Sequence, residues 1–431
     1  MPDMETIFAL ASARGKSGVA VLRLSGPRAH DVARAMAGSL PPPRQTALRP
    51  LRNAAGEALD TGLVVIFNAG ASFTGEDVAE LMVHGSLATI SAVESCLAND
   101  HGLRLAEPGE FTRRALENGV LDLTQVEGLS DLLEAETESQ RRQALRVLDG
   151  AIGKLVAGWR DHLIKAAALV EISIDFVEED IGNFDAQILA ELDIVQAELQ
   201  REIAGQGARE RVQTGFEIAL VGSVNAGKST LLNALAGREA AITSDIAGTT
   251  RDVIELRMDI GGYAVTLLDT AGLRETEETI ESIGIARGQK RADEADLRII
   301  LCDGPGIAPP VAAKAGDIVL FGKADLFPGI EGGISGLTGQ GIESLLSRIR
   351  TVLESRIARD GVTIRRRHLQ AMQQADIALS LAIEKLRDAE YIPELVAADI
   401  RQAMSALDSL IGKIDVEDLL GDIFASFCIG K

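Results

Sequence analysis

One stretch in the middle of the chain decides its fold: Phe216–Leu235, with the sequence FEIALVGSVNAGKSTLLNAL. An apolar run typical of a buried strand comes first, a glycine-containing loop follows, and a helical pattern completes the stretch. Within it, Gly222–Ser229 matches the pattern G-x-x-x-x-G-K-S/T. Because the glycines let the backbone curl, several N–H groups can point toward bound phosphates. The stretch therefore predicts a phosphate-binding loop between a strand and a helix.

The side chains of this loop are suited to a nucleoside triphosphate with magnesium. Lys228 brings positive charge to the outer phosphates and is predicted to act in catalysis, and the Ser229 hydroxyl is predicted to bind Mg²⁺. The match follows an apolar strand and opens a helix, which is the context that such a loop requires. The residues expected around the phosphates are Asn225, Ala226, Gly227, Lys228, Ser229 and Thr230.

Two downstream segments are predicted to complete the phosphate and magnesium site. In Gly248–Asp252 (GTTRD), Thr250 can close over Mg²⁺ and the γ-phosphate as a ligand and catalytic group. In Asp269–Gly272 (DTAG), the aspartate holds the metal through water and the glycine N–H meets the γ-phosphate. Their order and spacing indicate a switch-type nucleotide hydrolase. The nucleotide contacts expected here are Gly248, Thr249, Thr250, Asp269, Thr270, Ala271 and Gly272.

The base-reading segment departs from the usual pattern. GTPases of this class use N-K-x-D after a strand, and this chain has GKAD at Gly322–Asp325. Asp325 can read the guanine N1–H and amino group, and Lys323 is in place, but Gly322 lacks the amide that ties the loop together. GTP is favoured over ATP, with weaker affinity than an asparagine would give. Ser335 is expected to begin a third base-contact loop.

Bulk composition constrains the class of protein. A length of 431 residues predicts two or three domains. The formal net charge of −21 disfavours nucleic-acid and anionic-lipid partners, unless basic residues cluster locally. Three cysteines form no disulfide framework, which fits a reducing compartment. We see no secretory signal and no run near ~18 apolar residues, so a cytoplasmic protein without a membrane span is expected.

Periodicity divides the chain into three parts. Residues 1–118 alternate short apolar runs with turn signals and are predicted to form an α+β domain. Residues 119–210 and 356–431 have helical periodicity and predict one all-α domain in two segments. Between them, residues 211–355 alternate strands and helices, which indicates an inserted α/β domain with a parallel sheet and helices on both faces. The segment 205–215 is expected to be a linker.

With these residues in view, the chain resembles the MnmE (TrmE) family of tRNA modification GTPases. The marker segments are LRLSG, SFTGEDVAELMVHG (72–85), EPGEFTRRALENG (107–119), the nucleotide motifs, and FCIGK (427–431). The resemblance implies an N-terminal folate-binding domain that forms a homodimer, a helical domain in two segments, and an inserted GTPase domain.

The resemblance also implies an activity. With an FAD-dependent partner of the MnmG (GidA) type, the family adds a carboxymethylaminomethyl group to C5 of the wobble uridine of certain tRNAs. The one-carbon unit comes from a methylene-tetrahydrofolate. Two alternatives stay open: a regulatory GTP switch in RNA or ribosome assembly, and an ATPase, which Gly322 alone favours. A pure switch needs neither the folate positions nor the FCIGK segment.

By resemblance, K⁺ replaces an arginine finger in the nucleotide site. The ion would be held by Asn225 and by a loop that supplies Ser244, Ile246 and Thr249, in a nucleotide-binding segment that includes Asp245 and Ala247. A cation beside the β- and γ-phosphates neutralises the charge that builds during transfer. Glu281 matches the family glutamate that orients the attacking water.

The family's folate positions fall on Arg23, Glu80, Val120 and Lys431. The ligand would be a 5-formyl- or 5,10-methylene-tetrahydrofolate, with a basic residue at its glutamate carboxylate and an acidic one at the pterin amino group. The family has a lysine where this chain has Val120, so that charged contact is gone. Cys428 lies in the FCIGK segment, where an inert thiol is favoured over a nucleophile.

Overall fold

The computed structural model describes residues 5–175, 184–223, 225–238, 255–269, 290–327, 329–357, 362, 365–388, 390–412, 427 and 430. They divide into two compact units. The first comprises residues 1–130, 147–161 and 404–431, and the second comprises 131–146 and 162–403. The division into three domains at the boundaries expected from the sequence stays a prediction.

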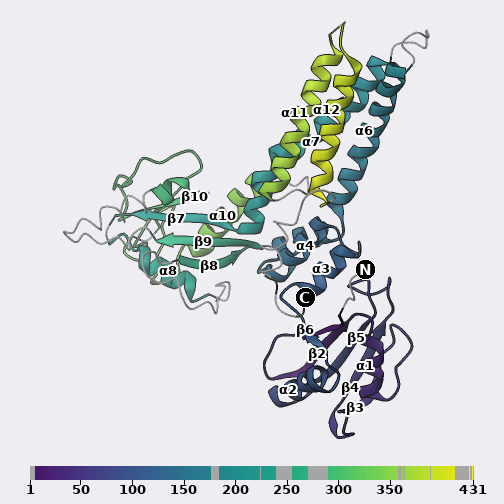
Figure 1. Cartoon of the computed structure of the whole chain (residues 1–431). Helices are drawn as coiled ribbons and strands as arrows, with labels where there is room; N and C mark the ends of the chain where they lie inside the picture. Colours follow the sequence, from purple (N-terminus) through teal and green to yellow (C-terminus); the bar gives the residue numbers. More distant parts are fainter. Residues whose placement is uncertain are drawn as a thin grey trace, which may run out of the picture. The chain divides into compact units, whose positions relative to one another are not determined.

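The first unit contains a six-stranded sheet, drawn in purple and blue in Figure 1. Neighbouring strands are antiparallel except for the parallel pair β1–β6. In spatial order the strands are β3 (Ala47–Arg52), β4 (Ala58–Phe67), β5 (Val78–Gly85), β2 (Ser17–Ser25), β1 (Ile7–Leu10) and β6 (Arg104–Leu105). The α+β fold predicted for this part is confirmed.

Two helices cover one face of this sheet. They are α1 (Ala29–Ala37) and α2 (Leu87–Ser95), which continues into a π-helical turn, η1 (Cys96–Asp100). Leu22 and Leu24 of β2 are buried against them. Since successive strand residues point to opposite faces, Val21 and Arg23 lie on the other face. That second face therefore carries the candidate ligand residues of the first unit.

Helices α3 (Glu110–Glu117) and α4 (Leu123–Glu134) add buried residues to the core of the first unit. Phe111 of α3 packs with Ile7 on the second face of the sheet. Phe427 packs against Val126 of α4. Gly430 has a φ of +102°, and a Cβ there would lie 2.2 Å from the Leu10 carbonyl oxygen. The FCIGK segment is thus anchored at two described points, and only glycine fits the second.

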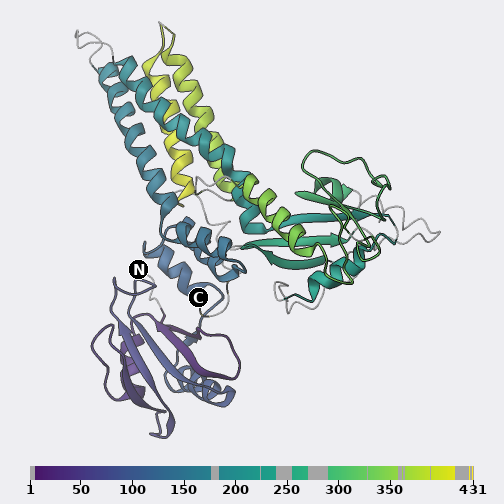
Figure 2. The same cartoon turned by 180° about the vertical axis from the view of Figure 1, so that it is seen from behind.

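The other described helices outside the nucleotide domain have between 11 and 30 residues. They are α5 (Glu138–Leu148), α6 (Ala151–Asp175), α7 (Asp185–Thr214), α11 (Arg366–Leu386) and α12 (Pro393–Leu410). In the second unit, α7 and α11 run side by side, as Figures 1 and 2 both show. No helix among the described residues is long and apolar enough to cross a membrane. The helical character predicted for these parts of the chain is confirmed in the described residues, whereas the bounds 119–210 and 356–431 stay a prediction.

The predicted linker at 205–215 is wrong, because residues 205–214 form the last turns of α7 and Gly215 is its C-cap. Gly205, Gln206 and Arg209 are buried on one side of the helix. The Arg209 guanidinium donates to the Glu202 carboxylate at 2.9 Å. Each helical glycine costs about 1 kcal/mol relative to alanine. Burial of this face and satisfied polar groups offset that cost, which composition alone does not reveal.

The second unit holds a five-stranded sheet with the nucleotide motifs. Its order is β11 (Ile318–Phe321), β10 (Leu297–Cys302), β7 (Phe216–Gly222), β9 (Tyr263–Asp269) and β8 (Glu255–Ile260). The first four are parallel neighbours, whereas β8 is antiparallel to β9. Strand β8 was not predicted, because its sequence ELRMDI is polar and partly exposed at the sheet edge. Helices α8 (Lys228–Ala236) and α10 (Ile342–Arg356) pack on one face.

Candidate nucleotide site and N-terminal ligand pocket

The phosphate loop lies between the carboxyl end of β7 and the first turn of α8. Asn225 has a φ of +66° and Gly227 one of +95°. These left-handed conformations turn the chain sharply before the helix begins at Lys228. The free N–H groups at a helix start attract anions. The loop therefore has the backbone form that its sequence predicted.

Lys228 is a buried cation held by the loop itself. Its side chain donates from Nζ to the carbonyl oxygens of Gly222 and Ser223, at 2.6 and 2.8 Å. Burial lowers its pKa, and the nearby Asp269 carboxylate opposes that shift. Asp269 is also buried, at the end of β9. A buried ammonium beside a helix start is suited to bind phosphate oxygens.

The base-reading residues meet beyond the carboxyl ends of β10 and β11. The Ser335 hydroxyl donates to the Asp325 carboxylate at 2.6 Å and is itself buried. Lys323 has a φ of +58°, and its Nζ lies 2.5 Å from an oxygen of Asp303. The structure thus brings Lys323, Asp325 and Ser335 together, and their contacts with guanine stay predictions.

Gly322 lies directly against the phosphate loop. A Cβ at this position would lie 2.3 Å from the Ala226 carbonyl oxygen and 3.3 Å from that of Cys302. No side chain fits there unless one of these backbones moves. The position that the Cβ of any larger residue would occupy is therefore taken by the phosphate-loop backbone.

The motif alone predicts tighter GTP binding with asparagine than with Gly322, and the close approach of Ala226 reverses that expectation. Replacing Gly322 by asparagine is expected to weaken GTP binding roughly tenfold, because the added side chain pushes the phosphate loop away. The measurement is titration with a fluorescent GTP analogue. Gly329→Asn is the control, since its φ of +83° suits asparagine and a Cβ there meets nothing within 4 Å. Tighter binding by Gly322→Asn than by the native chain would contradict this account.

Magnesium would rely on few protein ligands here. Among the described residues, no group of three histidine, cysteine, aspartate or glutamate side chains could hold a metal. The hydroxyl of Ser229 is a hard oxygen ligand, and the carboxylate of Asp269 can hold the metal through water. Mg²⁺ usually completes its coordination with substrate phosphates and water when the protein supplies only one or two oxygen ligands. The donor set fits Mg²⁺ bound together with a nucleotide.

Several predicted residues lie outside the described part of the chain. They are Ser244, Asp245, Ile246, Ala247, Gly248, Thr249, Thr250, Thr270, Ala271, Gly272, Glu281, Cys428 and Lys431. Of the predicted K⁺ ligands only Asn225 is described, and of the predicted Mg²⁺ ligands only Ser229. The proposed roles of the others therefore rest on the sequence.

A second candidate site is a cavity of about 540 Å³ on the second face of the N-terminal sheet. Arg23 and Glu80 are directly opposed on β2 and β5, and Arg23 Nε lies 2.9 Å from a Glu80 oxygen. The guanidinium lies 5.3 Å from the ring centre of Phe73 and 5.7 Å from that of Phe111. The lining residues are Arg23, Arg44, Phe67, Gly70, Ala71, Ser72, Phe73, Val78 and Glu80.

Val120 is absent from this lining, although the family resemblance places it at a folate position. Its side chain lies beside Gly75, where a Cβ would come within 3.0 Å of it. Sequence reasoning missed Arg44, Phe67 and Phe73. Phe73 lies in the marker segment 72–85, but nothing in that segment indicates a ligand contact, and Phe67 lies in no quoted segment. Only the folded sheet brings these separate segments to one cavity.

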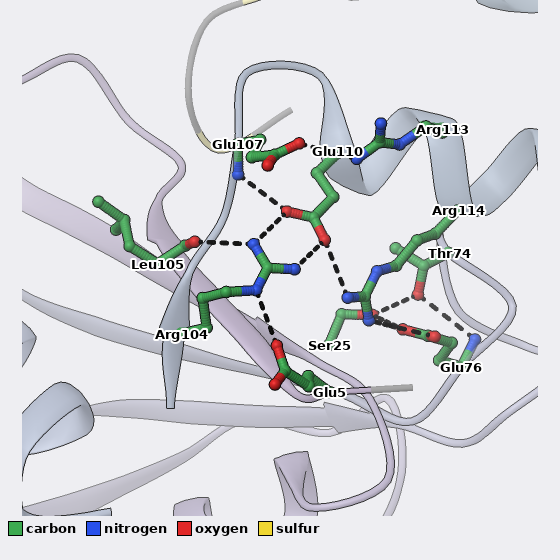
Figure 3. A network of polar contacts seen from close by, with 10 residues as sticks. All are labelled: Glu5, Ser25, Thr74, Glu76, Arg104, Leu105, Glu107, Glu110, Arg113 and Arg114. Carbon is green, nitrogen blue, oxygen red and sulfur yellow. Dashed lines mark hydrogen bonds and ion pairs between the residues drawn. The ribbon is translucent and has the colours of Figure 1, made fainter. Parts of the chain in front are cut away.

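A buried ionic network joins elements next to this cavity, although its residues do not line the cavity themselves (Figure 3). Arg114 donates to Glu110 and to Glu76, both at 3.0 Å, and the Ser25 hydroxyl donates to Glu76 at 2.6 Å. Burial raises the pKa of Glu110, but hydrogen bonds from Arg104, the Glu107 amide and Arg114 together lower it to about 2. The network joins α3, which carries Phe111, to β2, which carries Arg23.

Comparisons with known proteins cover nearly the whole chain. The MnmE helical domain family matches residues 123–428, and the GTP-binding protein TrmE N-terminus matches residues 6–120. The tRNA modification GTPase MnmE of Ruegeria pomeroyi is 54% identical over 429 residues, with 99% of this chain and 100% of that protein covered. The protein of the same description from Cereibacter sphaeroides is 56% identical over 430 residues, with the same coverage of 99% and 100%. A solved structure of the G domain of the T. maritima FeoB iron transporter is 25% identical, covers 32% of this chain and 98% of that chain, and has a TM-score of 0.24.

Proposed function

This chain belongs to the MnmE family of tRNA modification GTPases, and we propose that its GTP hydrolysis drives modification of the wobble uridine in the cytoplasm. With an FAD-dependent partner of the MnmG type, it adds a carboxymethylaminomethyl group at C5 of that base. One observation supports this proposal above all: the same chain contains a phosphate loop around buried Lys228 and a separate cavity lined by polar and aromatic residues. A simple GTP switch has no use for that cavity.

The N-terminal cavity suits a tetrahydrofolate derivative, in its 5-formyl or 5,10-methylene form. Glu80 offers a carboxylate to the amino and N–H groups of a pterin ring, and Phe67 and Phe73 offer apolar ring surfaces. Arg23 holds Glu80 in place through the 2.9 Å contact. When bound, such a folate supplies the one-carbon unit of the modification.

The test of this function is mass analysis of the wobble uridine in tRNA. Cells that lack the protein should lose the carboxymethylaminomethyl group, and the native chain should restore it. A Glu80→Ala chain should fail to restore it while keeping GTP hydrolysis. If the wobble uridine is unaltered in cells that lack the protein, the modification role is excluded. The alternative, a regulatory GTP switch in RNA or ribosome assembly, would then be favoured.

Potassium is proposed to take the place of an arginine finger, with Asn225 as one of its ligands. Asn225→Ala should therefore remove the K⁺ stimulation of hydrolysis and leave GTP affinity nearly unchanged, because K⁺ acts mainly on charge in the transition state. Phosphate release in K⁺ against Na⁺ buffer measures this effect. Equal rates of the native chain in both buffers would remove K⁺ from the mechanism.

Glu281 is proposed to orient the attacking water. Glu281→Ala, measured in the same phosphate-release assay, should therefore slow turnover without weakening GTP binding.

A homodimer is proposed to form through the second face of the N-terminal sheet. Leu48 and Leu63 are paired across β3 and β4, and they are 62% and 40% exposed. Val19 of β2 is 57% exposed. Apolar side chains gathered on one sheet face mark an interaction surface. This face also carries Arg23 and Glu80, so a second copy would lie close to the folate cavity.

The double variant Leu48→Glu/Leu63→Glu is expected to shift the protein from dimer to monomer, because the charges would be buried on association. Light scattering after size-exclusion chromatography gives the mass. Leu87→Glu is the matched control, since Leu87 is 57% exposed on α2, which covers the opposite face of the sheet. A double variant that stays dimeric would place the interface elsewhere.

A further inference from the structure

We infer that Arg44 binds the carboxylates of the folate tail at the mouth of the N-terminal cavity, and that it gives a preference for folates with several glutamates. This inference rests on the proposed folate function. Arg44 belongs to no motif of the sequence. Three features of Arg44 support the inference. It lines the cavity, its backbone conformation is unusual for arginine, and it has hydrogen-bond donors that no described residue uses.

The residues that line the cavity carry one more positive charge than negative charge. Its charged lining residues are Arg23, Arg44 and Glu80. Arg23 and Glu80 neutralise each other at 2.9 Å, and both are mostly buried, with side chains 18% and 15% exposed. Arg44 is exposed, and no carboxylate of the described residues lies within ion-pair distance of it. The uncompensated charge thus lies at the open end of the cavity.

The backbone of Arg44 adopts a conformation that is costly for arginine. Its φ is +64°, and its N–H donates to the Ile66 carbonyl at 2.8 Å. Among the described residues only two other non-glycine residues have a positive φ, Asn225 and Lys323, and both belong to the nucleotide site. Such strain persists mainly where a ligand site uses it. Arg44 therefore resembles the ligand-site residues of this chain in its backbone.

The side chain of Arg44 is held in place but keeps free donors. Its Nη2 donates to the Ala71 carbonyl at 2.9 Å, and Ala71 itself lines the cavity. A guanidinium has five N–H groups in a planar fork, so the remaining groups can bind a carboxylate. The Ala71 contact keeps the fork at the rim and lowers the entropy cost of binding.

The direction of the ligand follows from these positions. The pterin ring would lie inside, between the Phe67 and Phe73 side chains, with its amino group at Glu80. The glutamate end would then leave through the mouth, where Arg44 lies. Each further glutamate of a folate adds a carboxylate at that mouth. A charge-assisted contact with one of them is expected to increase affinity roughly tenfold over the monoglutamate.

The experiment compares the full chain and three variants for binding of 5-formyl-tetrahydrofolate with one and with three glutamates, by calorimetry. Arg44→Asn removes the charge and keeps a residue that tolerates a positive φ. Arg44→Lys keeps the charge without the fork. Arg52→Asn is the control, because Arg52 is also exposed, also donates to one carbonyl, that of Gly56 at 2.8 Å, and does not line the cavity.

We expect the native chain and Arg52→Asn to bind the triglutamate about tenfold more tightly than the monoglutamate, and the ratio to fall in high salt. Arg44→Asn should bring the ratio close to one, and Arg44→Lys should keep part of it. A full preference in Arg44→Asn, or none in the native chain, would overturn the role of Arg44 while the folate assignment stands. If the native chain binds neither folate, the assignment itself fails.

Discussion

Replacing Lys228 by alanine is expected to lower the rate of GTP hydrolysis by at least about 100-fold, which is typical for loss of one charged group at the reacting phosphates. Lys228 is buried, and its Nζ donates to the carbonyl oxygens of Gly222 and Ser223, which carry no net charge. Its charge is therefore available to the phosphates. Alanine would leave the charge that builds on the transferred phosphoryl group without this partner.

The measurement is phosphate release at saturating GTP, with GTP affinity determined separately by fluorescence. Lys314→Ala is the matched control, because Lys314 lies in the same domain, is 59% exposed and pairs with Asp293 at 2.8 Å. It should keep native turnover. A Lys228→Ala chain that retains half of the native rate would show that the loop does not hold the reacting phosphates.

The phosphate loop was predictable because its conformation is local. The strand, the glycine at 227 and the lysine that follows lie close together in sequence, and the structure places them as expected. The base-reading loop was predictable in part. Its motif showed Asp325, but the contact between Gly322 and Ala226 joins residues far apart in the chain. Only the three-dimensional structure shows that a side chain at position 322 would clash with the backbone of the phosphate loop.

Elements that depend on tertiary packing could not be predicted from the sequence. Residues 205–214 contain glycines and polar residues that suggest a linker, yet a buried face keeps them helical. Strand β8 has no strong apolar pattern, and it is formed by antiparallel pairing with β9 at the sheet edge. The N-terminal cavity combines residues of β2, β4 and β5 with loop residues such as Arg44. No spacing in the sequence marks such a set.

Replacing Arg114 by leucine is expected to destabilise the N-terminal domain by about 3–5 kcal/mol, as is typical when one partner of a buried ion pair is removed. Arg114 is 6% exposed, and its guanidinium is shared by the carboxylates of Glu110 and Glu76. Leucine would leave two largely buried carboxylates with fewer donors. Hydrogen exchange of peptides from residues 72–80 and 104–118, measured on the full chain, reports this local stability.

The same network predicts how stability depends on pH. Glu110 has a pKa of about 2 in the folded state against 4.5 for the free side chain, which corresponds to a contribution on the order of 3 kcal/mol. Since the folded-state pKa is the lower one, this contribution is complete above pH 4.5 and is lost as the pH falls toward 2. Exchange in these peptides should therefore accelerate over that interval, after correction for the intrinsic pH dependence.

Arg113→Leu separates the role of the network from that of any arginine on α3. Arg113 is the neighbouring residue, but its contact with Glu107, at 3.1 Å, joins side chains that are 37% and 64% exposed. Exposed pairs contribute about 0–1 kcal/mol, so this variant should exchange almost as the native chain does. Equal protection in Arg113→Leu and Arg114→Leu would mean that the buried carboxylates are neutralised in some other way. A strong loss in Arg114→Leu alone, together with weaker folate binding, would show that the network holds α3 and Phe111 in place beside Arg23.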